Sequence, residues 1–308
     1  MINNNSNKIL WITFAVLLTA VIIIFTTDST KKERSFRKEL VAVDTASITN
    51  ISLFPKSIHG KEVKIFKENS IWKAETNNGK SFVVPKTKIK NLLSAIVNIK
   101  PQRIAARNKN KWSEYEIDSS STRIVVKEGN SKVLDLQIGK FAFQQPRSMT
   151  TFVKLTDDND VYEVDGFLNV TFNKDVDSFR DETVIKSDKN NWSKLNFTSN
   201  NMNNNYSLVK LDNKWSINGA ILDSAKTDNA LNSLSRLTNS NFVNIEKNEL
   251  PPQFAKLIIE STTDEPVEIV AFKDSTNYII HSSINPENYF DGNKIGNKIF
   301  LDKNSFFK

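Results

Sequence analysis

The sequence predicts a strand-rich α+β protein in which an N-terminal transmembrane helix precedes two tandem repeats. Each repeat is expected to contain an antiparallel hairpin, one amphipathic helix and then a β-meander. Three observations lead to this prediction. A charge-free segment long enough to span a bilayer lies near the N-terminus, a tryptophan-containing hairpin pattern occurs twice, and each hairpin is followed by apolar residues at helical spacing.

The N-terminal segment carries no charged residue from Ile9 to Thr27. Nineteen helical residues come close to the roughly 30 Å thickness of the hydrocarbon core, and Trp11 suits the headgroup region at one end. A cleaved signal peptide is the alternative, because Lys8 precedes the apolar run. The run is long for such a peptide and has no small-x-small cleavage site. We therefore expect residues 1–27 to be an uncleaved anchor that binds the membrane through residues 9–27.

The charges that flank this segment leave the orientation open. Only Lys8 and the amino terminus precede it, whereas five basic residues follow it: Lys31, Lys32, Arg34, Arg37 and Lys38. Counted by the positive-inside rule, they place the large domain in the cytoplasm. A short N-terminal tail that leads into an apolar run is, however, the usual arrangement of an export signal-anchor. Together with a resemblance given below, this arrangement favours a periplasmic domain.

The first repeat is expected at residues 46–182, after a polar and charged juxtamembrane stalk at 28–45. Apolar residues alternate over 48–53, which predicts a strand, and again on both sides of a polar corner at 68–70, which predicts a hairpin. After Pro85, apolar residues recur at spacings of three and four. This spacing predicts one amphipathic helix.

The second repeat, residues 183–308, shows the same order at nearly constant offsets. At an offset of 143, the hairpin residues Ile65, Lys67, Trp72 and Ala74 fall on Leu208, Lys210, Trp215 and Ile217. At an offset of 138, the residues of the helix and of the segment after it, Leu93, Ile96, Ile99 and Ile104, fall on Leu231, Leu234, Leu237 and Phe242. Asp223 is expected to cap the second helix.

The later parts of the repeats correspond less closely. Residues 124–138 resemble 257–271, and both predict two strands joined by a turn. Residues 162–168 are matched with 299–302, which predicts a last strand in each repeat.

Composition excludes several classes of protein. The chain has no cysteine, so disulfides, thiolate nucleophiles, zinc–thiolate sites and an N-terminal lipoprotein are excluded. The net charge of +7 is spread over 308 residues without a basic block or a nucleic-acid-binding motif. No nucleic-acid partner is therefore expected.

A search for chemistry identifies no catalytic residue, cofactor site or metal site. The two histidines, His59 and His281, have no partner at metal-ligand spacing. Residues 157–160 carry three aspartates, but they lack the alternating ligands of a calcium loop and predict a solvated hairpin turn. No nucleophile or phosphate-loop motif is present. We therefore expect a protein that is not an enzyme.

Two further features could bind partners. Trp72 and Trp215 could form a carbohydrate-stacking pair, but their equivalent positions in two hairpins fit core packing better. The loop 143–149 exposes a proline, an arginine and two glutamines between two strands and has no match in the second repeat. It is an ordinary long loop or a partner-docking loop formed by Gln144, Gln145, Pro146 and Arg147.

Several segments together resemble a family of membrane-anchored bacterial proteins. They are Arg34–Thr45, Ile51–Lys56, Ile104–Arg107, Lys111–Tyr115, Arg147–Thr150 and Val164–Phe167. The chain resembles the domain-of-unknown-function 4340 family, particularly its members from the Bacteroidetes. The resemblance implies a repeated strand-rich unit behind an N-terminal anchor and no catalytic residue. It also implies an association with auxiliary components of ABC transporters of the gliding-motility type.

We therefore expect a non-enzymatic accessory or scaffold protein of the bacterial inner membrane, which presents two β-rich modules to protein partners in the membrane or envelope. An ABC-type transporter is one such partner. Two alternatives stay open. One is a module that binds an envelope glycan or lipid, and the other is a hydrolase with a pair of carboxylates assembled by the fold.

Overall fold

The computed structural model describes residues 11–19, 37–76, 78–144 and 148–307. Its first sheet is antiparallel and has nine strands. In spatial order they are β4 (Ser81–Val83), β3 (Ile71–Glu75), β2 (Val63–Glu68), β1 (Asn50–Phe54), β6 (Thr122–Glu128), β7 (Ser131–Gln144), β8 (Ser148–Leu155), β9 (Val161–Asp165) and β5 (Pro101–Ala106).

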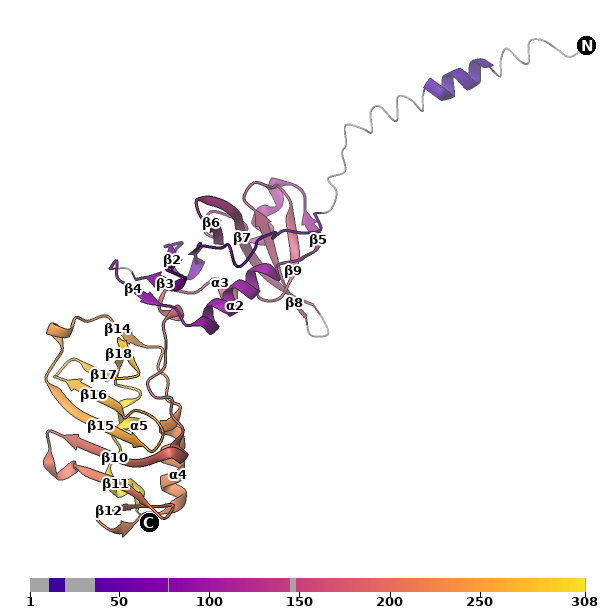
Figure 1. The fold of residues 1–308 in the computed structure, drawn as a ribbon. Coiled ribbons are helices and arrows are strands. Elements are labelled where there is room, and N and C mark those ends of the chain that lie inside the picture. The colour runs from indigo at the N-terminus through magenta and orange to yellow at the C-terminus, as the bar shows by residue number, and fades with distance from the viewer. Residues whose placement is uncertain (1–10, 20–36, 77, 145–147, 308) are drawn as a thin grey trace, which may run out of the picture.

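The second sheet has the same topology, with each strand replaced by the one nine places later in the chain. In spatial order they are β13 (Ala220–Ile221), β12 (Lys214–Ile217), β11 (Tyr206–Leu211), β10 (Trp192–Ser199), β15 (Gln253–Ser261), β16 (Val267–Lys273), β17 (Tyr278–Ser282), β18 (Asn285–Asp291) and β14 (Phe242–Val243). Figure 1 shows the two sheets as separate units joined by one connector, residues 173–191. The predicted strand-rich α+β fold with two repeats is confirmed.

The two tryptophan hairpins have the same register. Ile65 pairs with Ala74 in the first repeat, and Leu208 pairs with Ile217 in the second. The turns correspond as well, because the two central residues of each have positive φ: Asn69 and Ser70, and Asp212 and Asn213. Two left-handed residues give the backbone of a type I′ turn, whose twist suits a two-residue hairpin. The constant offset in sequence therefore reflects a shared backbone.

The amphipathic helices also occupy equivalent places. Helix α2 (Lys86–Val97) follows Pro85, and α4 (Ser224–Ser235) follows Asp223. The carboxylate of Asp223 accepts a hydrogen bond from the backbone N–H of Lys226, which confirms the predicted N-cap. Each helix covers one face of its sheet with buried aliphatic side chains.

The predicted match of residues 162–168 with 299–302 was wrong. Strand β9 corresponds to β18, and Ile299 is the last residue of the short helix α5 (Gly296–Ile299), which corresponds to α3 (Asn169–Phe172). The chain after these helices repeats at an offset of 127, so that Phe179 and Phe306 are both buried. Short apolar runs do not distinguish a strand from a helix, which explains the error.

Each sheet has its own hydrophobic core between its inner face and its helix. A third, smaller cluster lies on the outer face of the first sheet. There Phe152 and Val161 pack beneath a 3₁₀ segment, Lys109–Tyr115, that has a much shorter counterpart at Lys247–Glu249. Strand β8 is consequently buried on both faces over most of its length.

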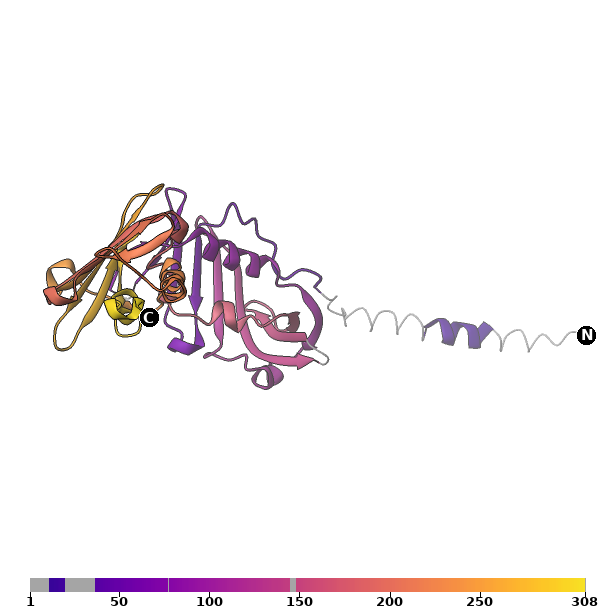
Figure 2. The ribbon, with the colours of Figure 1, turned by 90° about the horizontal axis from the view of Figure 1, so that it is seen from below.

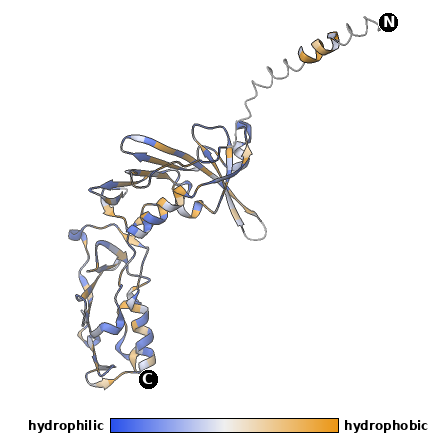
Figure 3. Cartoon of the chain, turned by 45° about the vertical axis from the view of Figure 1, so that its right-hand side comes forward, coloured by the Kyte–Doolittle hydropathy of each residue, from blue (hydrophilic) through white to orange (hydrophobic). Residues whose placement is uncertain are grey.

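The N-terminal segment is described only at residues 11–19, which form a helix. Figure 3 shows this helix largely in the colour of hydrophobic residues. Residues 9–10 and 20–27 of the expected anchor lie outside the described residues. Among the helices that are described, none has both the length and the hydropathy required to cross a membrane. In the region expected to be a stalk, Leu40 and Val41 are buried in the first core.

Candidate partner-docking groove

A groove of about 470 Å³ lies between α2 and the hairpin strands β3 and β4 of the first repeat. Trp72 lies in its lining. The backbone of Trp72 is fixed by a hydrogen bond of 2.9 Å, which its carbonyl oxygen accepts from the N–H of Val84. That bond also fixes the chain between β4 and the start of α2. The groove is therefore formed by three consecutive elements of one repeat.

The lining of this groove is apolar and carries charge of one sign. Its apolar members include Ile71 and Val83, whose side chains are 48% and 43% exposed. The charged members are Lys86 and Lys90, and none of the described residues that line the groove is acidic. Exposed aliphatic side chains beside lysines are suited to a partner segment with apolar anchors and acidic flanks.

The second repeat has an equivalent groove of about 490 Å³ around Trp215, but its chemistry differs. Ile71 corresponds to Lys214 by the register of the hairpins. At the helix offset, Lys90 corresponds to Asp228, which forms an ion pair with Lys189. The duplicated scaffold thus has an apolar groove in one repeat and a polar, charge-paired groove in the other.

A comparison with protein families agrees with this duplicated architecture. A family model described as "Domain of unknown function (DUF4340)" matches residues 72–254, which is more than half of the chain. The chain belongs to the DUF4340 family. None of the curated proteins and none of the solved structures that were compared matches it.

The region matched to DUF4340 begins at Trp72 in the groove and ends at Phe254, in β15 of the second repeat. It therefore contains α2, the strands β5 to β9 and the connector between the repeats. The DUF4340 match establishes family membership without giving an activity.

The predicted docking loop falls largely outside the described residues. Residues 145–147 are not described, and of Gln144 only the backbone at the end of β7 is described. The flanking residues are described, and they carry exposed apolar side chains: Phe141, Phe143 and Met149. Neither sheet register nor any described contact links this loop to the groove.

The two histidines lie far apart in the chain and in different repeats. His59 ends a 3₁₀ turn with a left-handed backbone. In β17, the His281 ring packs 5.0 Å from Tyr289, and its Nε2 lies 3.2 Å from the carbonyl oxygen of Pro286. Within the described residues, no three histidine or acidic side chains are grouped so as to hold a metal ion.

The aspartate-rich turn at 157–160 is organised around an internal ammonium group. Lys154 is 2% exposed, and its Nζ donates to the carbonyl oxygens of Leu155, Thr156 and Asp158 at 2.7, 3.3 and 2.9 Å. The same ammonium lies 4.4 Å from the ring centroid of Trp112. Burial lowers the pKa of Lys154, although nearby aspartates oppose the change. Carbonyl oxygens that could bind a cation are thus already bound by a lysine.

The two tryptophans of the carbohydrate-stacking hypothesis are packed against separate cores. Trp72 is half-buried against the first core, and Trp215 against the second. Each lies in the lining of its own groove, so they do not form one stacking platform.

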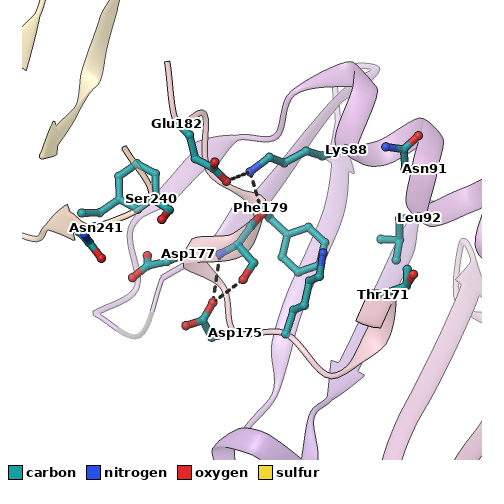
Figure 4. A pocket seen from close by; sticks show the side chains of 13 residues that line it. Lys88, Asn91, Leu92, Thr171, Asp175, Asp177, Phe179, Glu182, Ser240 and Asn241 are labelled. Atoms are coloured by element: carbon teal, nitrogen blue, oxygen red, sulfur yellow. Dashed lines mark hydrogen bonds and ion pairs between the residues drawn. The ribbon is translucent and has the colours of Figure 1, made fainter. Parts of the chain in front are cut away.

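A polar cleft of about 810 Å³ separates the repeats, and three of its lining residues are carboxylates (Figure 4). The Asp175 carboxylate accepts from Ser178, Asp177 pairs with Arg180, and Glu182 accepts from the Nζ of Lys88 at 2.7 Å. Lys88 also donates to the carbonyl oxygens of Ser178 and Arg180. Glu182 and the two carbonyl oxygens thus fasten the connector to α2 through Lys88, whereas Asp175 and Asp177 make contacts within the connector.

Sequence reasoning identified Trp72 and the helix of the groove but missed the groove itself. Ile71 and Val83 were unremarkable because each is a single apolar residue in a strand. Comparison of the repeats could have found Ile71, since this exposed isoleucine is matched by Lys214 at the same offset, but it could not have found Val83, whose counterpart Ile221 is also apolar.

Proposed function

We propose that this DUF4340 protein is a membrane-anchored, non-enzymatic accessory protein whose first repeat binds an apolar segment of a protein partner in the groove beside Trp72. The observation that supports this proposal is the divergence of the two grooves. A purely structural duplication has no need of an exposed apolar lining in one copy. Peptide segments are commonly recognised in such grooves, where apolar anchors supply affinity and flanking charges supply register.

The membrane is the proposed setting because of the charge-free segment from Ile9 to Thr27. We place the domain on the periplasmic side of a bacterial inner membrane. The resemblance to companions of gliding-type ABC transporters makes the membrane components of such a transporter the first partner to test.

The groove is tested by a charge substitution with a matched control in the second repeat. Val83 pairs with Lys73, and Ile221 pairs with the equivalent Ser216, so the two residues occupy corresponding places and both are exposed. We expect Val83→Glu to reduce the recovery of the native partner about tenfold or more, since it places a carboxylate in the apolar lining of a groove whose lysines are proposed to bind acidic flanks of the partner. Recovery is measured by quantitative mass spectrometry after purification in mild detergent.

The Ile221→Glu variant is expected to retain the partner at the level of the unmodified protein. Equal retention by all three proteins would refute the groove as the binding site. If no envelope protein, including transporter components, is enriched above a mock purification, the accessory function itself is refuted.

Topology is tested separately by reporter enzymes fused after residue 308. A reporter that is active only outside the cytoplasm is expected to be active, and a cytoplasm-specific reporter inactive. The opposite pattern would place both repeats in the cytoplasm, as the flanking basic residues alone suggest.

A further inference from the structure

The hairpin β7–β8 of the first repeat carries an aromatic patch that the second repeat lacks. Phe141 and Phe143 lie two residues apart on β7 and are 50% and 60% exposed. Met149 on β8 is the direct cross-strand partner of Phe143, and it is 43% exposed. Phe167, 36% exposed, adds a ring 4.6 Å from that of Phe141. These four residues are called the aromatic patch.

The backbone beneath the patch is held by hydrogen bonds. Thr151 is buried in β8, and its hydroxyl donates to the carbonyl oxygen of Gly166 at 2.6 Å and accepts from the N–H of Leu168. The N–H of Gly166 donates to the carbonyl oxygen of Met149 at 2.8 Å. Phe167 is thus fixed beside β8 in an exposed position, which does not result from a loose loop.

The aromatic patch is unusual for the rest of the molecule. In the described part of the two repeats, three of the four exposed aromatic residues belong to it. At the equivalent hairpin of the second repeat, β16 ends at Lys273 and β17 begins at Tyr278, and the lysine Nζ lies over the rings of Phe254 and Tyr278. In the second repeat, the Lys273 ammonium therefore covers the rings of Phe254 and Tyr278, whereas the rings of the aromatic patch in the first repeat are exposed to solvent.

We propose that the aromatic patch contacts the surface of the lipid bilayer in which the N-terminal segment is anchored. This inference rests on the anchoring in the proposed function and adds a second membrane contact. With about half of each side chain exposed, the patch offers roughly 350 Å². A stable protein interface needs about 800 Å² on each partner, so the patch is small for that purpose. A tethered bilayer contact needs less, because the anchor already holds the chain at the membrane.

The length of the tether permits this contact. The charge of Arg37 acts on the Tyr162 hydroxyl, where it opposes the rise in pKa that burial and Asp158 cause. Tyr162 pairs with Val153, and Met149 lies four residues further along β8, or about 13 Å. Ten residues from Thr27 to Arg37 can extend to about 35 Å.

The patch and the chain that precedes β1 lie on the same side of the first unit, which also permits a shared bilayer contact. In Figures 1 and 2, β8 and the indigo end of the first unit, which precedes β1, both lie on the side of that unit that faces away from the second. The patch and the anchor can therefore reach the same bilayer, with the second repeat projecting away from it.

The test uses the full-length chain reconstituted in vesicles of phosphatidylcholine and phosphatidylglycerol that contain nitroxide-labelled lipid. Because the chain has no cysteine, single cysteines can carry a fluorophore at chosen sites. Met149→Cys reports on the patch, Thr19→Cys on the anchor, and Met202→Cys, at a residue 83% exposed in the second repeat, is the control. Apolar side chains at an interface enter it by about 5–10 Å, so we expect about twofold or greater quenching at position 149 and little at 202.

Replacing Phe141 and Phe143 with serine in the Met149→Cys protein is expected to abolish most of that quenching, with unchanged circular dichroism showing that the fold is retained. Quenching at position 19 without quenching at 149 overturns the bilayer contact and leaves the anchor intact. A protein partner or a second copy on the patch would give that same result. Quenching at 149 without quenching at 19 supports the contact and refutes the anchor. Absence of quenching at both positions refutes both.

Discussion

The guanidinium carbon of Arg180 lies 4.7 Å from the ring centroid of Phe242, so the connector between the repeats packs directly on the second repeat. The same group lies 5.3 Å from the ring of Phe82 in the first repeat. Its Nη1 donates to the side-chain oxygen of Asn244 at 2.9 Å. One buried arginine thus contacts both repeats, and with Lys88 it makes the connector a fixed joint.

Replacing Arg180 with alanine is expected to loosen this joint. Loss of two ring contacts and a buried hydrogen bond lowers the free energy of unfolding by about 2–4 kcal/mol. It also broadens the distance distribution between spin labels at Lys127→Cys and Met202→Cys, measured by pulsed electron resonance. The exposed Arg236 serves as the control, and its alanine variant should keep the narrow distribution. An unchanged width in Arg180→Ala would show that the repeats are held together by other contacts.

Replacing Lys154 with methionine is expected to destabilise the first repeat. The side chain keeps its volume, but the carbonyl oxygens of Leu155 and Asp158 lose a buried donor, which costs about 2–4 kcal/mol. Urea unfolding followed by circular dichroism measures the loss. His281 occupies the equivalent place in β17 and is half-buried, so His281→Met should lower the free energy of unfolding much less than Lys154→Met does. Equal costs at the two positions would contradict a special role for the ammonium.

Replacing Asp135 with asparagine is expected to have a pH-dependent cost. Burial raises the pKa of Asp135, but hydrogen bonds from Arg123, Lys132 and Thr156 outweigh it and hold the pKa below its usual range. A lowered folded-state pKa gives stability that is complete above the unfolded value of about 3.9 and is lost as pH falls towards the folded value. We expect Asp135→Asn to lower the free energy of unfolding by about 2 kcal/mol at pH 7, and this difference should shrink below about pH 4.

The control for Asp135 is Glu268, which pairs with Lys256 at the equivalent place in the second repeat and is much more exposed. Glu268→Gln should change the free energy of unfolding by less than about 1 kcal/mol. A difference between Asp135→Asn and the unmodified protein that does not change from pH 7 to pH 3 would contradict the assigned ionisation.

The duplication could be predicted from the sequence because its strongest parts are local. Two-residue turns and helical spacing depend on neighbouring residues, and they are preserved at offsets of 143 and 138. Strand β10 was missed for a local reason as well. A register shift between Trp192 and Lys194 interrupts its alternation, so that Trp192 and Leu195 are both buried at a spacing of three.

The groove and the joint could not be predicted because they depend on tertiary packing. Ile71 and Lys90 come together only when α2 is laid across the sheet. Arg180 and Lys154 are charged residues in a loop and a strand, and no pattern marks a charged residue that will be buried. The aromatic patch was predicted in part. The sequence singled out the loop that the patch flanks, because the second repeat has no match for that loop.

The most direct test of the central claim, that the first-repeat groove binds a protein partner, is site-specific photo-cross-linking in cells. A photoreactive amino acid is placed at Ile71 in one strain and at the equivalent Lys214 in another, and both sites are exposed. Binding in the groove predicts a discrete cross-linked product at position 71 that Val83→Glu removes, and none at position 214. Identical patterns at the two positions, or no product at 71, would contradict it.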